Sequence, residues 1–188
     1  MKILACADLH GRRERADKVR ELVAHHRPDA VVLPGDITHT GRGTEALALL
    51  DELAGPVLAI TGNMDPPAVA RAIRDSRAKD PSDAPVEIKG VTFGGLGVPR
   101  CDVLVVHEPP RGTLDRVPSG AHIGSPAVRD YIEKRRPRVV LCGHVHECPG
   151  VVELGATTVV NCTMGDGRHA GAIVRLEGEK VQVELLAL

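Results

Sequence analysis

One recurring pattern constrains the fold of this chain more than any other feature. A short apolar run gives way to a turn carrying Asp, Asn or His, and this happens five times along the sequence. The five segments are ADLHG at 7–11, PGDIT at 34–38, TGNMD at 61–65, VVHEPP at 105–110 and CGHVHE at 142–147. Such runs are typical of buried parallel strands that end in loops. The pattern therefore predicts an α/β fold with a polar site at the strand ends.

Strand and helix patterns alternate in the first part of the chain. Apolar residues recur every three or four positions over 13–26, which predicts a helix, and a shorter helix is predicted over 46–53. Buried strands are predicted over 2–7, 29–34 and 56–61. Right-handed crossovers between such strands favour a mostly parallel sheet covered by helices.

The second half of the chain predicts more strands and one further helix. A hairpin is expected over 86–97 with its turn at Lys89-Gly90, and a helix over 125–135 with Ser125 as its N-cap. The remaining segments predict antiparallel strands that turn at 154–155 and 177–178. We therefore predict one domain over 1–188, with two stacked mixed sheets flanked by helices. Its terminal strand offers an edge for pairing in a homo-oligomer.

Charge and composition exclude several classes of function. The net charge is only −1, and Phe93 and Tyr131 are the only aromatic residues, so neither a basic field nor base stacking favours nucleic-acid binding. No apolar run is long enough to span a membrane, and the chain begins directly as a strand. Five cysteines without disulfide-type spacing agree with a reducing compartment. We expect a cytoplasmic protein with no membrane contact.

Local features of charge and cysteine placement have ordinary explanations. The run that contains Arg12, Arg13 and Arg15 is expected on solvated helix faces, with a positive rim that attracts a phosphate ester as the alternative. Cys148 and Cys162 lie near the motifs, but we do not expect either to be a metal ligand.

The spacing within the first and last motifs indicates metal binding. Asp8 and His10 are two residues apart, as are His144 and His146, so an extended backbone would point each pair to one side. A mixture of carboxylate oxygen and imidazole nitrogen suits Mn, Fe or Zn rather than Ca or Mg. The glycines that precede candidate ligands, and that allow close backbone approach, are Gly35, Gly62 and Gly143.

Taken in order, the five motifs resemble those of the calcineurin-like metallophosphoesterases, and the resemblance covers most of the chain. The segments HEPPRGTLD, AHIGSPAVRDYI and VVLCGHVHE resemble sequences of one small branch of this family. That branch includes the MPPED-type and class III cyclic-nucleotide phosphodiesterase-like proteins. The resemblance implies a four-layer α/β/β/α sandwich, with the site at the strand ends between the two sheets.

The resemblance also implies a centre of two divalent metal ions. Seven ligands are implied, which are Asp8, His10 and His146 for one metal, Asn63, His107 and His144 for the other, and Asp36 for both. Asp36, Asn63 and His144 would also act in catalysis. A shared carboxylate holds two cations roughly 3.5 to 4 Å apart, where a bridging hydroxide can attack phosphorus in line.

The sequence departs from the family at two positions. Met64 stands where the family has a histidine that steadies or protonates the leaving oxygen, and methionine has no proton to give. His39 and His122 lie in loops and are candidates for substrate contact or for a replacement acid, with a solvent-exposed role as the alternative. His39 and Thr40 also replace the Asp and Arg of the protein phosphatases, so activity on phosphoproteins is not expected.

These observations favour a binuclear metal-dependent phosphoesterase that acts on a small phosphate ester. A phosphodiesterase is expected rather than a phosphomonoesterase. The alternative is a metal-binding but weakly catalytic interaction scaffold of the Vps29 type. The full set of ligands argues for the enzyme, and Met64 argues for the scaffold.

Overall fold

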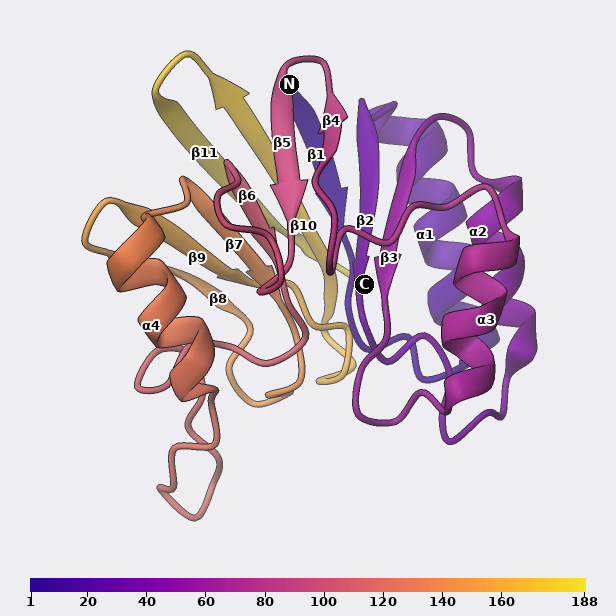
Figure 1. The fold of residues 1–188 in the computed structure, drawn as a ribbon. Coiled ribbons are helices and arrows are strands. Elements are labelled where there is room, and N and C mark those ends of the chain that lie inside the picture. The colour runs from indigo at the N-terminus through magenta and orange to yellow at the C-terminus, as the bar shows by residue number, and fades with distance from the viewer.

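The computed structural model describes residues 1–188 and contains two stacked sheets with helices on their outer faces (Figure 1). The first sheet contains β1 (Lys2–Ala5), β2 (Ala30–Pro34), β3 (Val57–Ile60), β10 (His169–Glu177) and β11 (Lys180–Ala187). The second sheet contains β4 (Val86–Ile88), β5 (Val91–Gly94), β6 (Val103–Val105), β7 (Val139–Cys142), β8 (Gly150–Leu154) and β9 (Thr157–Asn161). The helices are α1 (Arg13–His26), η1 (Thr44–Ala48), α2 (Leu49–Glu52), α3 (Pro67–Asp75) and α4 (Pro126–Arg135).

Both sheets are mixed, as predicted. The strand order is β11-β10-β1-β2-β3 in the first sheet and β4-β5-β6-β7-β9-β8 in the second. Strands β1, β2 and β3 are parallel, and β10 and β11 extend their sheet in antiparallel fashion. In the second sheet β5, β6, β7 and β9 are parallel, and the edge strands β4 and β8 are antiparallel.

Side chains alternate between two hydrophobic layers, because successive residues of a strand face opposite sides of its sheet. In β1, Ile3 and Ala5 pack between the two sheets, whereas Leu4 and the following Cys6 pack toward the helices on the first sheet. A third apolar cluster joins α4 to the second sheet. Both faces of the central strands are therefore buried, which explains their continuous apolar sequences. The predicted four-layer sandwich is confirmed.

The hairpin turns lie where the sequence places them. Lys89 and Gly90 both have positive φ, at 52° and 76°, as a tight two-residue turn between β4 and β5 requires. Gly155 and Gly178 occupy the turns of the other two hairpins, also with positive φ.

The helix predicted over 46–53 is wrong in detail. The structure has the 3-10 helix η1 followed by the single-turn α2, and Leu53 is already extended. The segment is confined between Gly43, whose φ is 72°, and the turn at Gly55. A segment this short can form only a few α-helical hydrogen bonds, so it gains little from the α-helical conformation. Short helical segments therefore often adopt the 3-10 conformation. The helices predicted over 13–26 and 125–135 match α1 and α4 closely, and no helix is both long and apolar enough to cross a bilayer.

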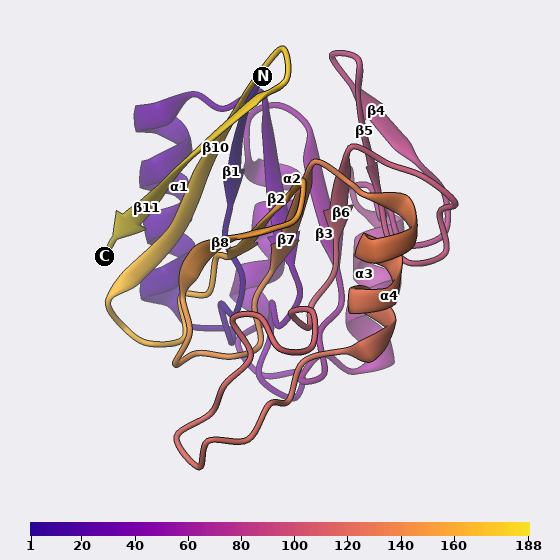
Figure 2. The same ribbon diagram turned by 90° about the vertical axis from the view of Figure 1, so that its left-hand side faces the viewer.

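The loops that follow β1, β2, β3, β6 and β7 gather at one end of the molecule. The long segment between β6 and α4 projects from the body at this same end (Figures 1 and 2).

Phe93 provides a test of the packing between the sheets, because its side chain is fully buried in the inter-sheet cluster. Replacing it with alanine should lower the free energy of unfolding by about 3 to 5 kcal/mol, through lost apolar burial and the cavity that remains. Urea denaturation followed by circular dichroism measures the change. The control Val152→Ala lies on an exposed face of β8 and should change stability by less than about 0.5 kcal/mol. Equal effects of the two substitutions would contradict this packing.

Candidate metal centre

The seven predicted ligand residues lie in five loops at the carboxyl ends of parallel strands. Asp8 and His10 follow β1, Asp36 follows β2 and Asn63 follows β3. From the second sheet, His107 follows β6, and the remaining two, His144 and His146, follow β7. Loops from both sheets therefore contribute side chains to one place.

One group of side chains combines the first motif with the last. The candidate ligand atoms of Asp8, His10 and His146 all lie within 4.8 Å of one another. The Nε2 atoms of His10 and His146 are 3.1 Å apart, and His146 Nε2 is 3.6 Å from Asp8 Oδ1. This is the set assigned above to the first metal.

A second group surrounds the side-chain oxygen of Asn63. Asn63 Oδ1 lies 2.9 Å from His107 Nε2 and 2.8 Å from His144 Nδ1. Asp36 lies between the groups, with Oδ2 at 3.4 Å from His107 Nε2 and 3.9 Å from His10 Nε2.

The Asp8 carboxylate reaches toward the second group as well. Candidate ligand atoms of Asp8, Asp36 and His107 also lie within 4.8 Å of one another. The family resemblance implies a shared position for Asp36 alone, so the central position of Asp8 is new information from the structure.

The chemistry of these donors fits divalent cations. Asp8 and Asp36 are 0% and 2% exposed, and their ion-pair partners are histidines alone. A buried carboxylate is costly without a compensating charge. In addition, His10 Nδ1 is buried without a hydrogen-bond partner while its Nε2 faces another imidazole nitrogen. Buried oxygen and nitrogen donors of this kind could hold metal ions such as Mn, Fe or Zn.

Burial and neighbouring charges shift the pKa values of the candidate ligands in different directions. Burial lowers the pKa of His10 and of His144, so both imidazoles are neutral and have free lone pairs at neutral pH. Burial raises the pKa of Asp8, but the adjacent imidazoles of His146 and His107 outweigh it and the carboxyl stays ionised. The Asp8 carboxylate in turn raises the pKa of His146.

The backbone at the centre is strained at four of the seven residues. Asp8, His10, Asp36 and His144 have φ values of 62°, 52°, 52° and 69°, in the left-handed region that L residues rarely occupy. The explanation given above for the paired spacing is therefore wrong, because Asp8 and His10 are not in extended backbone. Their side chains still converge, because two left-handed residues fold the loop back upon itself. Each such residue costs of order 1 kcal/mol, which surrounding contacts must offset.

The backbone contacts around Asp65 hold two of these loops together. Its Oδ2 accepts hydrogen bonds from the amides of Ile37 and Gly62, both at 3.0 Å. Its Oδ1 accepts from the amide and the hydroxyl of Thr38, at 2.8 and 2.9 Å. Asp65 thus positions the loops that carry Asp36 and Asn63. Asp65 belongs to the motif at 61–65, but the sequence alone did not indicate this role.

Two further contacts orient ligands. His107 Nδ1 bonds the Pro34 carbonyl at 2.9 Å, which turns Nε2 toward Asn63. The buried Arg15 donates to the Asp8 carbonyl at 2.6 Å. The prediction that Arg15 lies on a solvated helix face is therefore wrong.

Close approach explains the three glycines singled out from the sequence. A Cβ on Gly35 would lie 2.6 Å from His107 Nδ1, and one on Gly143 would lie 2.5 Å from Asp8 Oδ2. A Cβ on Gly62 would collide with the Asp36 carboxylate.

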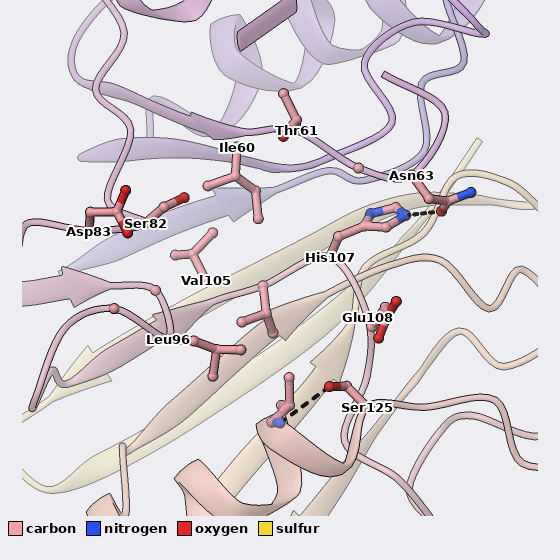
Figure 3. Close-up of a pocket in the computed structure, with 15 residues that line it drawn as sticks. Ile60, Thr61, Asn63, Ser82, Asp83, Leu96, Val105, His107, Glu108 and Ser125 are labelled. Atoms are coloured by element: carbon pink, nitrogen blue, oxygen red, sulfur yellow. Dashed lines mark hydrogen bonds between the residues drawn. The ribbon is translucent and has the colours of Figure 1, made fainter. Parts of the chain in front are cut away.

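The centre opens into a cleft of about 560 Å³. Besides five of the seven ligand residues, the cleft is lined by Arg12, Arg15, His39, Met64 and Gly165. The ring of the exposed His39 lies 5.5 Å from that of His10, measured between centroids. Asn63 also lines a second cleft, of about 440 Å³ (Figure 3).

The other candidate residues have different surroundings. His122 lines neither cleft, and its Nδ1 bonds the buried carboxylate of Asp115 at 2.6 Å within the projecting segment. Ser125 caps α4, as predicted, by accepting from the Val128 amide. Cys148 and Cys162 bond to backbone carbonyls and belong to neither metal-ligand group.

Comparison with known proteins identifies the family of this chain. The profile of the calcineurin-like phosphoesterase superfamily domain matches residues 1–172. An uncharacterized protein of Methanocaldococcus jannaschii is 30% identical over 196 residues, covering 86% of this chain and 87% of that protein. Human metallophosphoesterase domain-containing protein 1 is 38% identical over 65 residues, covering 34% of this chain and 20% of the human protein.

Solved structures with the same fold include a phosphodiesterase and a Vps29 protein. An archaeal phosphodiesterase has a TM-score of 0.68 and 19% identity, with 100% of both chains covered. Vps29 of Entamoeba histolytica, in complex with Zn²⁺, has a TM-score of 0.53 and 14% identity, covering 100% of this chain and 99% of that one. At these identities the likeness concerns the fold alone.

The tight contact at Gly62 provides a test of the centre. Gly62→Ala should displace the Asp36 carboxylate and weaken metal binding about 10- to 100-fold, as loss of ligand positioning does. Titration of Mn²⁺ or Zn²⁺ into chelator-treated protein, followed by calorimetry, measures the affinity. Gly150→Ala is the control, because Gly150 does not have a positive φ and a Cβ there would meet only the end of the flexible Leu114 side chain, at 3.1 Å. Unchanged affinity in a folded Gly62→Ala variant would remove Asp36 from the metal site.

Proposed function

Because the chain belongs to the calcineurin-like phosphoesterase superfamily, as its motifs predict, we propose that it is a phosphodiesterase dependent on two divalent metal ions. The position of Asp36 carries this proposal. Its Oδ2 faces His10 at 3.9 Å and His107 at 3.4 Å, and these two histidines belong to different ligand groups. A carboxylate between two ligand groups supports a role as the shared ligand of two metals.

Each metal would be held by one of the two groups. Asp8, His10 and His146 form the first group, whereas Asn63, His107 and His144 form the second, and Asp36 serves both. When bound, such a pair of cations supplies hydroxide near neutral pH and neutralises charge on phosphate oxygens. Mn, Fe and Zn all suit this donor set.

The remaining side chains of the cleft suit a phosphate ester. Arg12 and Arg15 line the cleft, and their positive charge favours an anionic phosphate beside the centre. His39 is the one imidazole lining this cleft that is not in the ligand set. It would supply a proton to the departing alcohol oxygen in place of the histidine that Met64 replaces.

The two clefts favour a diester over a monoester. They meet at Asn63, and their volumes are about 560 and 440 Å³. A phosphodiester carries two alcohol groups on phosphorus, and each group can occupy one cleft. A monoester has only one such group and would leave the other cleft unused.

Metal content and hydrolysis together test the proposal. With two equivalents of Mn²⁺, the protein should hydrolyse bis-p-nitrophenyl phosphate faster than p-nitrophenyl phosphate, as measured by nitrophenolate release. Asp36→Asn should lower the rate by at least about a hundredfold, because it removes the charge of the shared ligand. The exposed control Asp75→Asn should leave the rate unchanged. A protein that binds metal tightly but hydrolyses no ester would contradict the enzyme and favour an interaction scaffold.

Met64 is the observation that favours a scaffold of the Vps29 type. It lines the cleft and its backbone amide donates to Asp36 Oδ1 at 2.8 Å, but its side chain offers no acid. A protein of this second kind would retain the metals as part of a binding surface and catalyse poorly.

Restoring a histidine at this position tests the effect of the missing acid. Met64→His keeps the backbone bond to Asp36 and should raise hydrolysis of alkyl esters, which leave poorly, by about a hundredfold relative to nitrophenyl esters. Comparison of kcat for the two ester types measures the gain. Met64→Leu serves as the matched control without a titratable group. An unchanged ratio would show that an acid at position 64 has no role.

A further inference from the structure

A sixth loop lies beside the candidate metal centre, although it supplies none of the seven ligand residues. This loop, residues 161–165, follows β9 and is called the β9 loop below. Its side chains Asn161 and Thr163 are both fully buried. Because β9 is parallel to β7, the β9 loop leaves the sheet next to the loop that carries His144 and His146. Buried polar groups need hydrogen-bond partners, and these partners indicate what the β9 loop does.

The side-chain amide of Asn161 joins the β9 loop to the loop that follows β7. Its Nδ2 donates to the Val145 carbonyl at 2.9 Å, and its Oδ1 accepts from the Thr163 amide at 3.2 Å. Val145 lies between His144 and His146 and is itself only 1% exposed. One buried side chain therefore fixes the β9 loop and the residue that precedes His146.

Backbone hydrogen bonds join the β9 loop to the first sheet as well. The Ala7 amide donates to the Cys162 carbonyl at 3.0 Å, and the Met164 amide donates to the Ala7 carbonyl at 2.9 Å. Ala7 directly precedes Asp8, so these bonds position the strand end that carries Asp8 and His10. The β9 loop thus connects the two sheets at the candidate metal centre.

The end of the β9 loop packs directly against one of the ligand residues. A Cβ on Gly165 would lie 2.3 Å from both Cγ and Cδ2 of His146, so glycine is needed to leave room for this imidazole. The Gly165 amide donates to Thr163 Oγ1 at 2.9 Å, which fixes the glycine in place. The contacts of the β9 loop therefore favour the first ligand group, which contains Asp8, His10 and His146.

We propose that the β9 loop positions the ligands of the first metal, with Asn161 as the positioning residue that anchors it. The loop holds Asp8 and His146, which come from different sheets, at the separation that one ion needs. The second ligand group depends less on this loop, because Asn63 and His107 follow β3 and β6. The inference rests on the two-metal centre of the proposed function, and metal binding can test it without any substrate.

The metal content of Asn161→Ala tests this role. Mn²⁺ is titrated into chelator-treated protein and followed by calorimetry and by electron paramagnetic resonance, which distinguishes a coupled pair of ions from an isolated ion. The unaltered protein should give the coupled signal. Asn161→Ala should bind one of the two ions about 10- to 100-fold more weakly, because the loss of a residue that orients ligands has effects of this size. Its signal should match that of His146→Ala, which removes a ligand of the first metal.

A matched control separates positioning from general loss of stability. Val159→Ala also truncates a fully buried side chain of β9, but Val159 packs in the apolar cluster under α4. This variant should keep the coupled pair of ions. The same loss of one ion in Val159→Ala, or a signal of Asn161→Ala that matches His107→Ala instead, would overturn the proposal.

Gly165→Ala tests the β9 loop without leaving a buried cavity. Its Cβ would displace the His146 imidazole, so this variant should also lose the first metal selectively. Circular dichroism shows whether each variant is folded, and Gly165→Ala decides the outcome if Asn161→Ala is not folded. A coupled pair of unchanged affinity in the folded variants would overturn the role of the loop and leave the proposed function intact. Absence of a coupled pair in the unaltered protein would instead contradict the proposed two-metal centre.

Discussion

Two buried carboxylates without a lysine or arginine partner determine the charge balance of the candidate metal centre. Asp8 and Asp36 are removed from water, and only imidazoles lie close enough to pair with them. Burial of such charges costs several kcal/mol unless cations compensate. The surrounding structure holds these charges in place: Asp65 ties two loops together and Arg15 bonds the Asp8 carbonyl. Cations held among the surrounding oxygen and nitrogen donors would compensate these two negative charges.

Much of the fold and most of the candidate ligands could be predicted from sequence, because the relevant signals are local. The central strands are buried on both faces, so they appear as unbroken apolar runs, and the ligand residues follow directly after them. The hairpin turn at Lys89-Gly90 is equally local. The short helix before Gly55-Pro56 was misjudged because helical periodicity over eight residues does not distinguish a 3-10 turn from an α-turn.

Features that depend on contacts between distant loops were not visible in the sequence. The extended geometry expected for Asp8 and His10 was wrong, because their left-handed backbone is imposed by neighbouring loops. Arg15 looked like a surface residue, but its guanidinium turns back to the carbonyl of Asp8. The second cleft depends on how residues 80–83 meet residues 94–97, and those segments lack any shared motif. The way side chains from distant loops come together depends on the tertiary structure. The spacing of residues along the sequence indicates it only in part.

The distribution of the ligands along the chain has a consequence for how metal is acquired. Asp8, Asp36 and Asn63 follow strands β1 to β3, whereas His107 and His144 follow β6 and β7, which are synthesised later. A nascent chain that has emerged only as far as α3 holds an incomplete set of donors and no second sheet to support them. On the proposed function, the full set of donors is present only once both sheets have docked. Selection among competing ions would then depend on the finished cavity rather than on the strongest binder met by an unfolded chain.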